Sequence, residues 1–202
     1  MAEQLTSQAG GAAAGAGAVP DITVDGEQLQ LGQVERVARG GAKAVFAGES
    51  IKKMQASREM LEQWLEEGKV VYGITTGFGP FVSTLIPPKF QTELQHNLIR
   101  SHSANVGPVF SAEETRAAML LRLNVFAKGY SAVRLSLAEL LLAMLNRGIH
   151  PRIPEWGSVG ASGDLTPSAH LALAMTGEGE AEYRGQFMPA KVALELAGLQ
   201  PV

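Results

Sequence analysis

The stretch GSVGASGD, residues 157–164, is followed directly by the apolar segment LTPSAHLALAMT, residues 165–176. Three glycines in eight residues disfavour a regular helix or strand, whereas the segment after them has the composition of a helix that ends at Gly177. Asp164 occupies the position of a helix cap. The sequence therefore predicts a tight loop that closes onto the start of a helix. Three interpretations of this loop differ in their chemistry.

The first two interpretations require no covalent change. The loop can be a flexible connector that ends on a capped helix, or a phosphate cradle, because glycine-rich loops at helix starts present free N–H groups. Phosphate loops of the Walker type carry a lysine near the helix start, but here Asp164, Leu165 and Thr166 follow the last glycine. Because an acidic side chain repels phosphate, the sequence disfavours a phosphate site.

The third interpretation is peptide cyclisation within Ala161-Ser162-Gly163. The Gly163 amide nitrogen attacks the Ala161 carbonyl carbon and closes a five-membered ring. Loss of one water, and of the Ser162 hydroxyl as a second, leaves an exocyclic methylidene group. Ala161 leaves its carbonyl uncrowded, and Gly163 tolerates the strained turn. These three residues by themselves are compatible with all three interpretations.

A second irregular segment, residues 71–88, contains three glycines and three prolines, which exclude a regular helix. It carries the stretch YGITTGFG, residues 72–79. Tyr72 can be a packed aromatic residue whose hydroxyl is hydrogen-bonded. It can also act as a general base, if nearby positive charge or hydrogen bonds stabilise its phenolate. The residues alone leave both roles open.

His102 lies at the predicted end of a helix that starts at Lys89, where a histidine can simply interact with the last carbonyl groups. The chain has no cysteine, and its other histidines form no HxxxH pair. The sequence therefore predicts no zinc site and no other metal. Those other histidines are His96, His150 and His170.

The rest of the sequence predicts a mainly α-helical fold with a few short strands. Residues 22–24 favour a strand that runs into an Asp25-Gly26 turn, and residues 183–186 favour a tight turn. The helix after Ser131 is apolar around most of its circumference, which predicts that it is buried. The predicted helices are 31–39, 51–67 with Ser50 as cap, 89–102, 112–128 with a Ser111/Glu114 capping box, 132–147, 165–176 and 189–197.

Composition narrows the function classes. The chain has 202 residues, of which 46% are hydrophobic and 18% charged, so one domain and part of a second are expected. A net charge of -3 gives no basic field for nucleic acid or an anionic membrane, and no apolar run reaches the about 20 residues that cross a bilayer. The lack of cysteine fits a reducing cytoplasm. Residues 1–20, rich in alanine and glycine, predict a disordered tail before a domain at 21–202.

Five stretches together resemble the family of histidine, phenylalanine and tyrosine ammonia-lyases and the related 2,3-aminomutases. They occur in the order of the family and at roughly its spacing, and the resemblance covers residues 23–202. GSVGASGDL is highly specific for this family, and its pairing with YGITTGFG favours cyclisation over the other two interpretations. The stretches are YGITTGFG (72–79), LQHNLIRSHSANVG (94–107), RLNVFAKGYSAVR (122–134), GIHPRIPEWGSVGASGDLTP (148–167) and GEGEAEYRGQ (177–186).

The resemblance implies the N-terminal part of the histidine/phenylalanine ammonia-lyase fold, in the fumarase/aspartase-like superfamily. It implies that Ala161, Ser162 and Gly163 form a 4-methylidene-imidazol-5-one (MIO) cofactor. The substrate amine would add to its methylidene carbon, and Tyr72 would remove the β-proton, which releases an unsaturated acid and ammonia. His102 would contact the substrate side chain. Ser101-His102 resembles the histidine-lyase and tyrosine-aminomutase pattern, whereas phenylalanine lyases usually have Phe-Leu there.

The sequence departs from the family at two positions and in length. Asn105 stands where many members have glycine, and Ser168 stands where leucine is common. Members are considerably longer, so the chain is expected to end before a central helical bundle that supplies an Asn-Gly-Thr segment and the residues that bind the substrate carboxylate. Family sites assemble from several subunits of a homotetramer. A homotetramer and an uncovered bundle interface are therefore expected.

The predicted function is elimination of ammonia from an aromatic or heteroaromatic L-amino acid, with histidine or tyrosine favoured. A 2,3-aminomutase that gives a β-amino acid is the close alternative, because it shares the ring and the base. A catalytically incomplete fragment is the other alternative, because the chain stops directly after a predicted helix. The expected partner is a small amino acid substrate, without nucleic acid or membrane.

Overall fold

The computed structural model describes residues 20–202, so the predicted tail at 1–20 lies outside the described residues except for Pro20. The described part is mainly α-helical with short strands, as predicted. None of its helices is long and apolar enough to cross a membrane.

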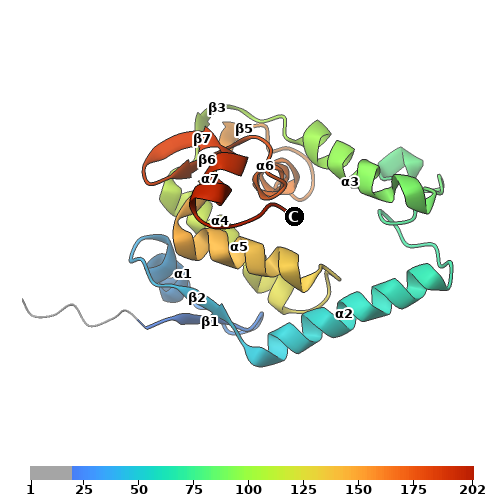
Figure 1. Ribbon diagram of the computed structural model, residues 1–202, viewed down its shortest axis with the longest axis horizontal. Coiled ribbons are helices and arrows are strands. Elements are labelled where there is room, and N and C mark those ends of the chain that lie inside the picture. The colour runs from blue at the N-terminus through green and yellow to red at the C-terminus, as the bar shows by residue number, and fades with distance from the viewer. Residues whose placement is uncertain (1–19) are drawn as a thin grey trace, which may run out of the picture.

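Helices α4 (Ala112–Ala127) and α5 (Leu135–Arg147) form the centre of the molecule (Figure 1). α4 begins at the predicted capping box: the Glu114 amide donates to Ser111 Oγ at 3.2 Å, and the Ser111 amide donates to the Glu114 carboxylate at 2.9 Å. α1 (Leu31–Ala38) packs across α4. The predicted burial of α5 is confirmed. Its fully buried side chains, with those of α4, are Met119, Leu120, Leu123, Leu141, Met144 and Leu145.

Three small sheets surround this centre, and the sequence predicted only parts of them. β1 (Ile22–Val24) is the predicted strand, and it pairs in parallel with the unpredicted β2 (Ala44–Phe46). The predicted tight turn is confirmed, since Arg184 and Gly185 both have positive φ between two antiparallel strands. The remaining strands are β3 (Val106–Val109) paired with β5 (Pro154–Trp156), and β4 (Ile149–Pro151), β6 (Glu180–Tyr183) and β7 (Gln186–Pro189) in one antiparallel sheet, which α7 (Ala190–Leu196) follows.

α2 (Gly48–Glu66) leads away from the centre and α3 (Pro88–His102) leads back to it (Figure 1). The segment between them therefore lies at the far end of both helices. It is irregular, as predicted, with one short 3-10 helix (Gly79–Phe81) and one isolated bridge from Thr76 to Leu85. α3 ends at His102, as predicted, and packs against α6 (Leu165–Met175).

Two predicted helix caps are wrong. α2 begins at Gly48 with Ala47 as its N-cap, and the buried Ser50 hydroxyl donates instead to the Asp25 carbonyl at 3.1 Å. Asp164 holds the N-cap position of α6, but its side chain caps no helix amide, because Arg122 binds its carboxylate at 2.7 Å. In both cases a contact with a distant segment takes the side chain that the local pattern assigned to the helix end.

Candidate active site

The loop 157–164 joins β5 to α6 and depends on glycine at three positions. Gly157, Gly160 and Gly163 have φ angles of 147°, 86° and 72°, which side chains with a Cβ rarely adopt. Ala161 and Ser162 between them are exposed. A Cβ at Gly160 would meet nothing within 4 Å, and one at Gly163 would meet only Ser158 Oγ at 3.6 Å. The tripeptide therefore has open space around it, which fits formation of a ring from its own backbone.

Hydrogen bonds within the loop hold its two ends together. The Ser158 hydroxyl donates to the Gly163 carbonyl, and the Thr166 hydroxyl donates to the Gly157 carbonyl at 3.3 Å. Each bond joins a residue before the tripeptide to one at its end or after it. The chain on either side of Ala161 and Ser162 is therefore tied back on itself.

Asn105 supports the base of the loop. It is 7% exposed, and its Oδ1 and Cγ lie 2.5 and 2.8 Å from the position that a Cβ at Gly157 would take. Its Nδ2 donates to the Pro154 carbonyl at 2.9 Å, and its backbone N–H donates to His170 Nε2 at 3.2 Å. Its Oδ1 is buried without a hydrogen-bond partner. This departure from the family pattern thus lies directly against the start of the loop 157–164.

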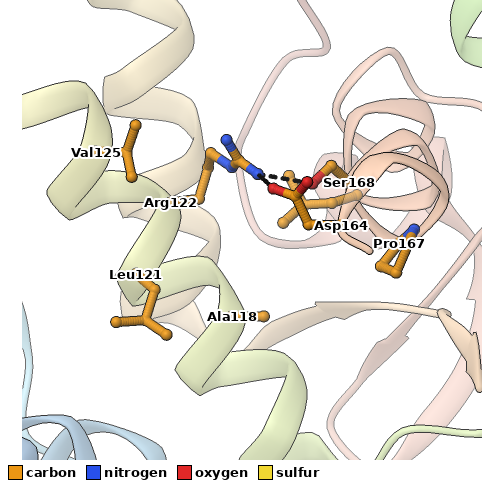
Figure 2. Close-up of a pocket in the computed structure, with 8 residues that line it drawn as sticks. Ala118, Leu121, Arg122, Val125, Asp164, Pro167 and Ser168 are labelled. Carbon is orange, nitrogen blue, oxygen red and sulfur yellow. Dashed lines mark hydrogen bonds and ion pairs between the residues drawn. The ribbon is translucent and has the colours of Figure 1, made fainter. Parts of the chain in front are cut away.

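Arg122 fixes the far end of the loop. Its Nη2 donates to Asp164 Oδ2 at 2.7 Å and to Ser168 Oγ at 2.8 Å (Figure 2). The hydrogen bond from Arg122 lowers the pKa of the Asp164 carboxyl below its ordinary value, and the Ser162 hydroxyl lowers it further. Arg122, Asp164 and Ser168 border a pocket of about 280 Å³ between α4 and α6. Its other lining residues are Ala118, Leu121, Val125, Pro167 and Leu171.

Tyr72 lies away from this loop, in the segment between α2 and α3 (Figure 1). Its side chain is 59% exposed, its hydroxyl accepts a hydrogen bond from the Gly79 amide at 3.2 Å, and its ring meets Phe78 edge-on at 5.8 Å. Within residues 20–202, no hydrogen bond or ion pair joins residues 67–87 to the loop 157–164. A single chain therefore does not bring Tyr72 to the tripeptide.

His102, at the end of α3, is half-buried. Its Nδ1 lies 2.9 Å from the Leu98 carbonyl and 3.0 Å from Ser101 Oγ, so the predicted interaction with the last helix carbonyls is present. Two bonds from the Arg100 guanidinium to Glu178, at 2.9 and 2.8 Å, fasten this end of α3 to the segment after α6. His102 therefore lies at the end of α3, which packs against α6, the helix that directly follows the loop. Tyr72 lies instead in the segment between α2 and α3.

Residues 20–202 contain no group of three or more His, Cys, Asp or Glu side chains arranged to hold a metal ion.

A family model of aromatic amino acid lyases matches residues 29–202. The chain belongs to this family. Histidine ammonia-lyases from Gloeobacter violaceus and Myxococcus xanthus are each 49% identical to it, over 90% and 91% of the chain and 35% and 36% of their own lengths. The chain of this aromatic amino acid lyase family member thus spans about a third of the length of the curated relatives it matches.

Solved structures confirm the fold that the resemblance implied. Tyrosine aminomutase from Streptomyces globisporus superposes with a TM-score of 0.83 at 42% identity, over 90% of this chain and 34% of that one. Ergothionase from Treponema denticola gives a TM-score of 0.85 at 32% identity, over 90% and 36%. This lyase-family chain therefore has the fold of the ammonia-lyases and aminomutases, in the portion that it spans.

Sequence reasoning missed the contact between Arg122 and Asp164. Arg122 stands first in RLNVFAKGYSAVR, a stretch that the resemblance singled out, but no local pattern pairs it with a carboxylate 42 residues later in the chain. The glycine-rich loop directly before a helix led the sequence reasoning to assign Asp164 to the cap of that helix. The partner is revealed only by the folded structure, in which Arg122 of α4 reaches across to Asp164 and Ser168.

Proposed function

We propose that this chain carries the ring-forming part of an ammonia-lyase that eliminates ammonia from an aromatic or heteroaromatic L-amino acid, with histidine or tyrosine favoured. The observation that carries the proposal is the loop 157–164, where an exposed Ala161-Ser162 pair lies between glycines with positive φ. The 49% identity to histidine ammonia-lyases supports it over a flexible connector or a phosphate cradle.

In the proposed site, Ala161, Ser162 and Gly163 supply the MIO ring from their own atoms. The ring, once formed, provides an electrophile for the substrate amine and so makes the amine a better leaving group. Open space at Gly160 and Gly163 leaves room for a substrate beside the tripeptide. No metal is required.

Tyr72 is proposed as the base that removes the β-proton. Its side chain is exposed, and its hydroxyl accepts a hydrogen bond from the Gly79 amide at 3.2 Å, so the phenolic oxygen is held at the surface. Because its own chain holds it far from the tripeptide, Tyr72 is proposed to serve the loop of a neighbouring subunit in a homotetramer. His102 is proposed to contact the substrate side chain, since α3 packs on α6 beside the loop.

A 2,3-aminomutase is the second candidate, and one observation favours it specifically: the chain is 42% identical to a tyrosine aminomutase over 90% of its length. The two reactions share the ring and the base. They differ in whether the amine leaves or returns at the β-carbon. A catalytically incomplete fragment is the third candidate, because the chain spans only about a third of the length of the relatives it matches.

The test is the intact mass of the purified full-length protein, with peptide mapping across residues 157–165. The expected result is loss of two waters located at Ala161–Gly163 and abolished by Ser162→Ala. Ser136→Ala, which removes an exposed serine on α5, is the matched control and should keep the loss. An unmodified mass in the full-length protein would contradict the proposal.

A further inference from the structure

Arg122 reaches from the central helix to the residue that directly follows the ring-forming tripeptide. Its guanidinium donates hydrogen bonds to Asp164 at 2.7 Å and to Ser168 at 2.8 Å. One side chain therefore contacts both the end of the loop and the first turn of α6 (Figure 2). We propose that Arg122 is a positioning residue for ring formation, which holds Asp164 so that the Gly163 nitrogen stays close to the Ala161 carbonyl. This inference rests on the proposed function.

α4 holds the backbone of Arg122 in a fixed position. Its N-terminus is closed by the Ser111/Glu114 capping box, and Met119 and Leu123, on either side of Arg122 in the sequence, are fully buried. The Arg122 side chain itself is only 29% exposed, against 61% for Asp164. The arginine is therefore the fixed partner of the pair, and the loop residue is the one that is held.

Ring closure needs such a constraint. A bond forms from the Gly163 nitrogen to the Ala161 carbonyl carbon. One water leaves with the Ala161 oxygen and the hydrogens of the Gly163 and Ser162 amides, and a second leaves with the Ser162 hydroxyl and its Cα hydrogen. No electrons are gained or lost overall. The two reacting atoms lie two residues apart, and a free loop would lose backbone conformational entropy in order to bring them together.

Two hydrogen bonds supply that constraint, one at each end of the loop. Thr166 holds Gly157 at the start of the loop at 3.3 Å, and Arg122 holds Asp164 at its end. The hydrogen bond from Arg122, together with its positive charge, also lowers the pKa of the Asp164 carboxyl, as expected for a carboxylate that is paired with a guanidinium. Without Arg122, an unpaired carboxylate next to the tripeptide would be free to turn toward solvent and take Gly163 with it.

A purely structural role for the pair is the competing explanation, and the lysine variant separates the two. The test follows the rate of two-water loss by intact mass after synthesis of the full-length protein, in the parent, Arg122→Gln, Arg122→Lys and Asp164→Asn. Arg122→Gln and Asp164→Asn should slow ring formation about tenfold, because each removes a charge-assisted hydrogen bond. Arg122→Lys, which keeps the charge, should recover part of the rate.

Arg39→Gln is the matched control. It breaks the ion pair at 2.8 Å between Arg39, at the end of α1, and Glu113, in the first turn of α4. This pair lies at the end of α4 away from the loop, so the rate should be unchanged. The midpoint of urea unfolding in each variant reports folding separately, and Asp164→Asn replaces Arg122→Gln if the latter does not fold. Ring formation at the parental rate in folded Arg122→Gln or Asp164→Asn would overturn the inference, as would equal slowing in Arg39→Gln. A parent protein that loses no water would instead overturn the proposed function itself.

Discussion

Replacement of Gly157 by alanine tests how closely the loop 157–164 is packed against Asn105. Gly157 has a φ of 147°, and a Cβ built there would lie 2.5 Å from Asn105 Oδ1, 2.8 Å from its Cγ and 2.9 Å from its Cα. The first two atoms can move with the side chain of Asn105. The Cα cannot, because it belongs to the backbone at the start of β3. The added methyl group must therefore displace either the loop or the strand.

Two costs add up in this variant. A residue with a Cβ at such a φ stores about 1–3 kcal/mol of backbone strain, and overlap with a packed neighbour costs about 1–3 kcal/mol more. Gly157→Ala should thus lower the free energy of unfolding by about 2–6 kcal/mol. That is a large share of the about 5–15 kcal/mol that stabilises an ordinary domain.

Gly160→Ala is the matched control, in the same loop. Gly160 also has a positive φ, 86°, but a Cβ there would meet nothing within 4 Å. Both variants therefore carry backbone strain, and only Gly157→Ala adds the overlap. Urea unfolding followed by circular dichroism should show Gly157→Ala to be less stable than Gly160→Ala by about 1–3 kcal/mol.

A third variant tests the identity of the neighbour. In Asn105→Ala/Gly157→Ala the Oδ1 and Cγ contacts are gone, so the double variant should be more stable than the sum of the two single effects predicts. Equal stability of Gly157→Ala and Gly160→Ala, or strict additivity in the double variant, would refute the close contact between Asn105 and the loop.

Two further predictions concern the frame around the loop. Ser111→Ala removes the side-chain cap of α4 and should cost about 1 kcal/mol of unfolding free energy, while Ser136→Ala, with no cap to lose, should change it by less than about 0.5 kcal/mol. Burial, and then the charge of Arg116, lower the pKa of His150 from its ordinary value of 6.5. The unfolded chain therefore binds the proton more readily, so the unfolding free energy should fall as pH drops below about 6.5, and His150→Gln should flatten that fall between about pH 7.5 and about pH 5.5. A pH dependence that His150→Gln leaves unaltered would contradict this assignment.

The helices could be predicted from the sequence because their signals are local. The Ser111/Glu114 capping box and the end of α5 at Gly148, with a φ of 72°, each depend on a few neighbouring residues. The tight turn at Arg184-Gly185 is another such case. Strand β2 was missed for the opposite reason. Its three residues AVF carry almost no pattern, and they become a strand only because β1, some twenty residues earlier, pairs with them.

The two wrong caps show the same limit at the level of single side chains. Ser and Asp before a helix favour capping because their oxygens can reach a free helix amide. The Ser50 hydroxyl instead satisfies the Asp25 carbonyl, and the Asp164 carboxylate instead binds a guanidinium from α4. A charge-assisted bond to arginine is stronger than a bond to a neutral amide. At Asp164 a charged partner therefore outweighs the local preference, whereas at Ser50 the helix begins two residues earlier and the hydroxyl binds a distant carbonyl instead.

The candidate site shows the same difference between residues that are adjacent in the sequence and residues that only the fold or an assembly brings together. Ala161, Ser162 and Gly163 are adjacent in the sequence and were singled out through the family resemblance. The structure places Thr166 and Arg122, which bond the two ends of their loop, in the same chain. Tyr72 is different: its side chain is exposed, and it belongs to the segment between α2 and α3, which lies at the far end of both helices (Figure 1). Under the proposed function, the chain can therefore prepare its electrophile through contacts of its own, whereas proton removal depends on a neighbouring subunit. Formation of the ring and turnover of a substrate then become separable steps, the first set by α4 and α6 and the second by assembly.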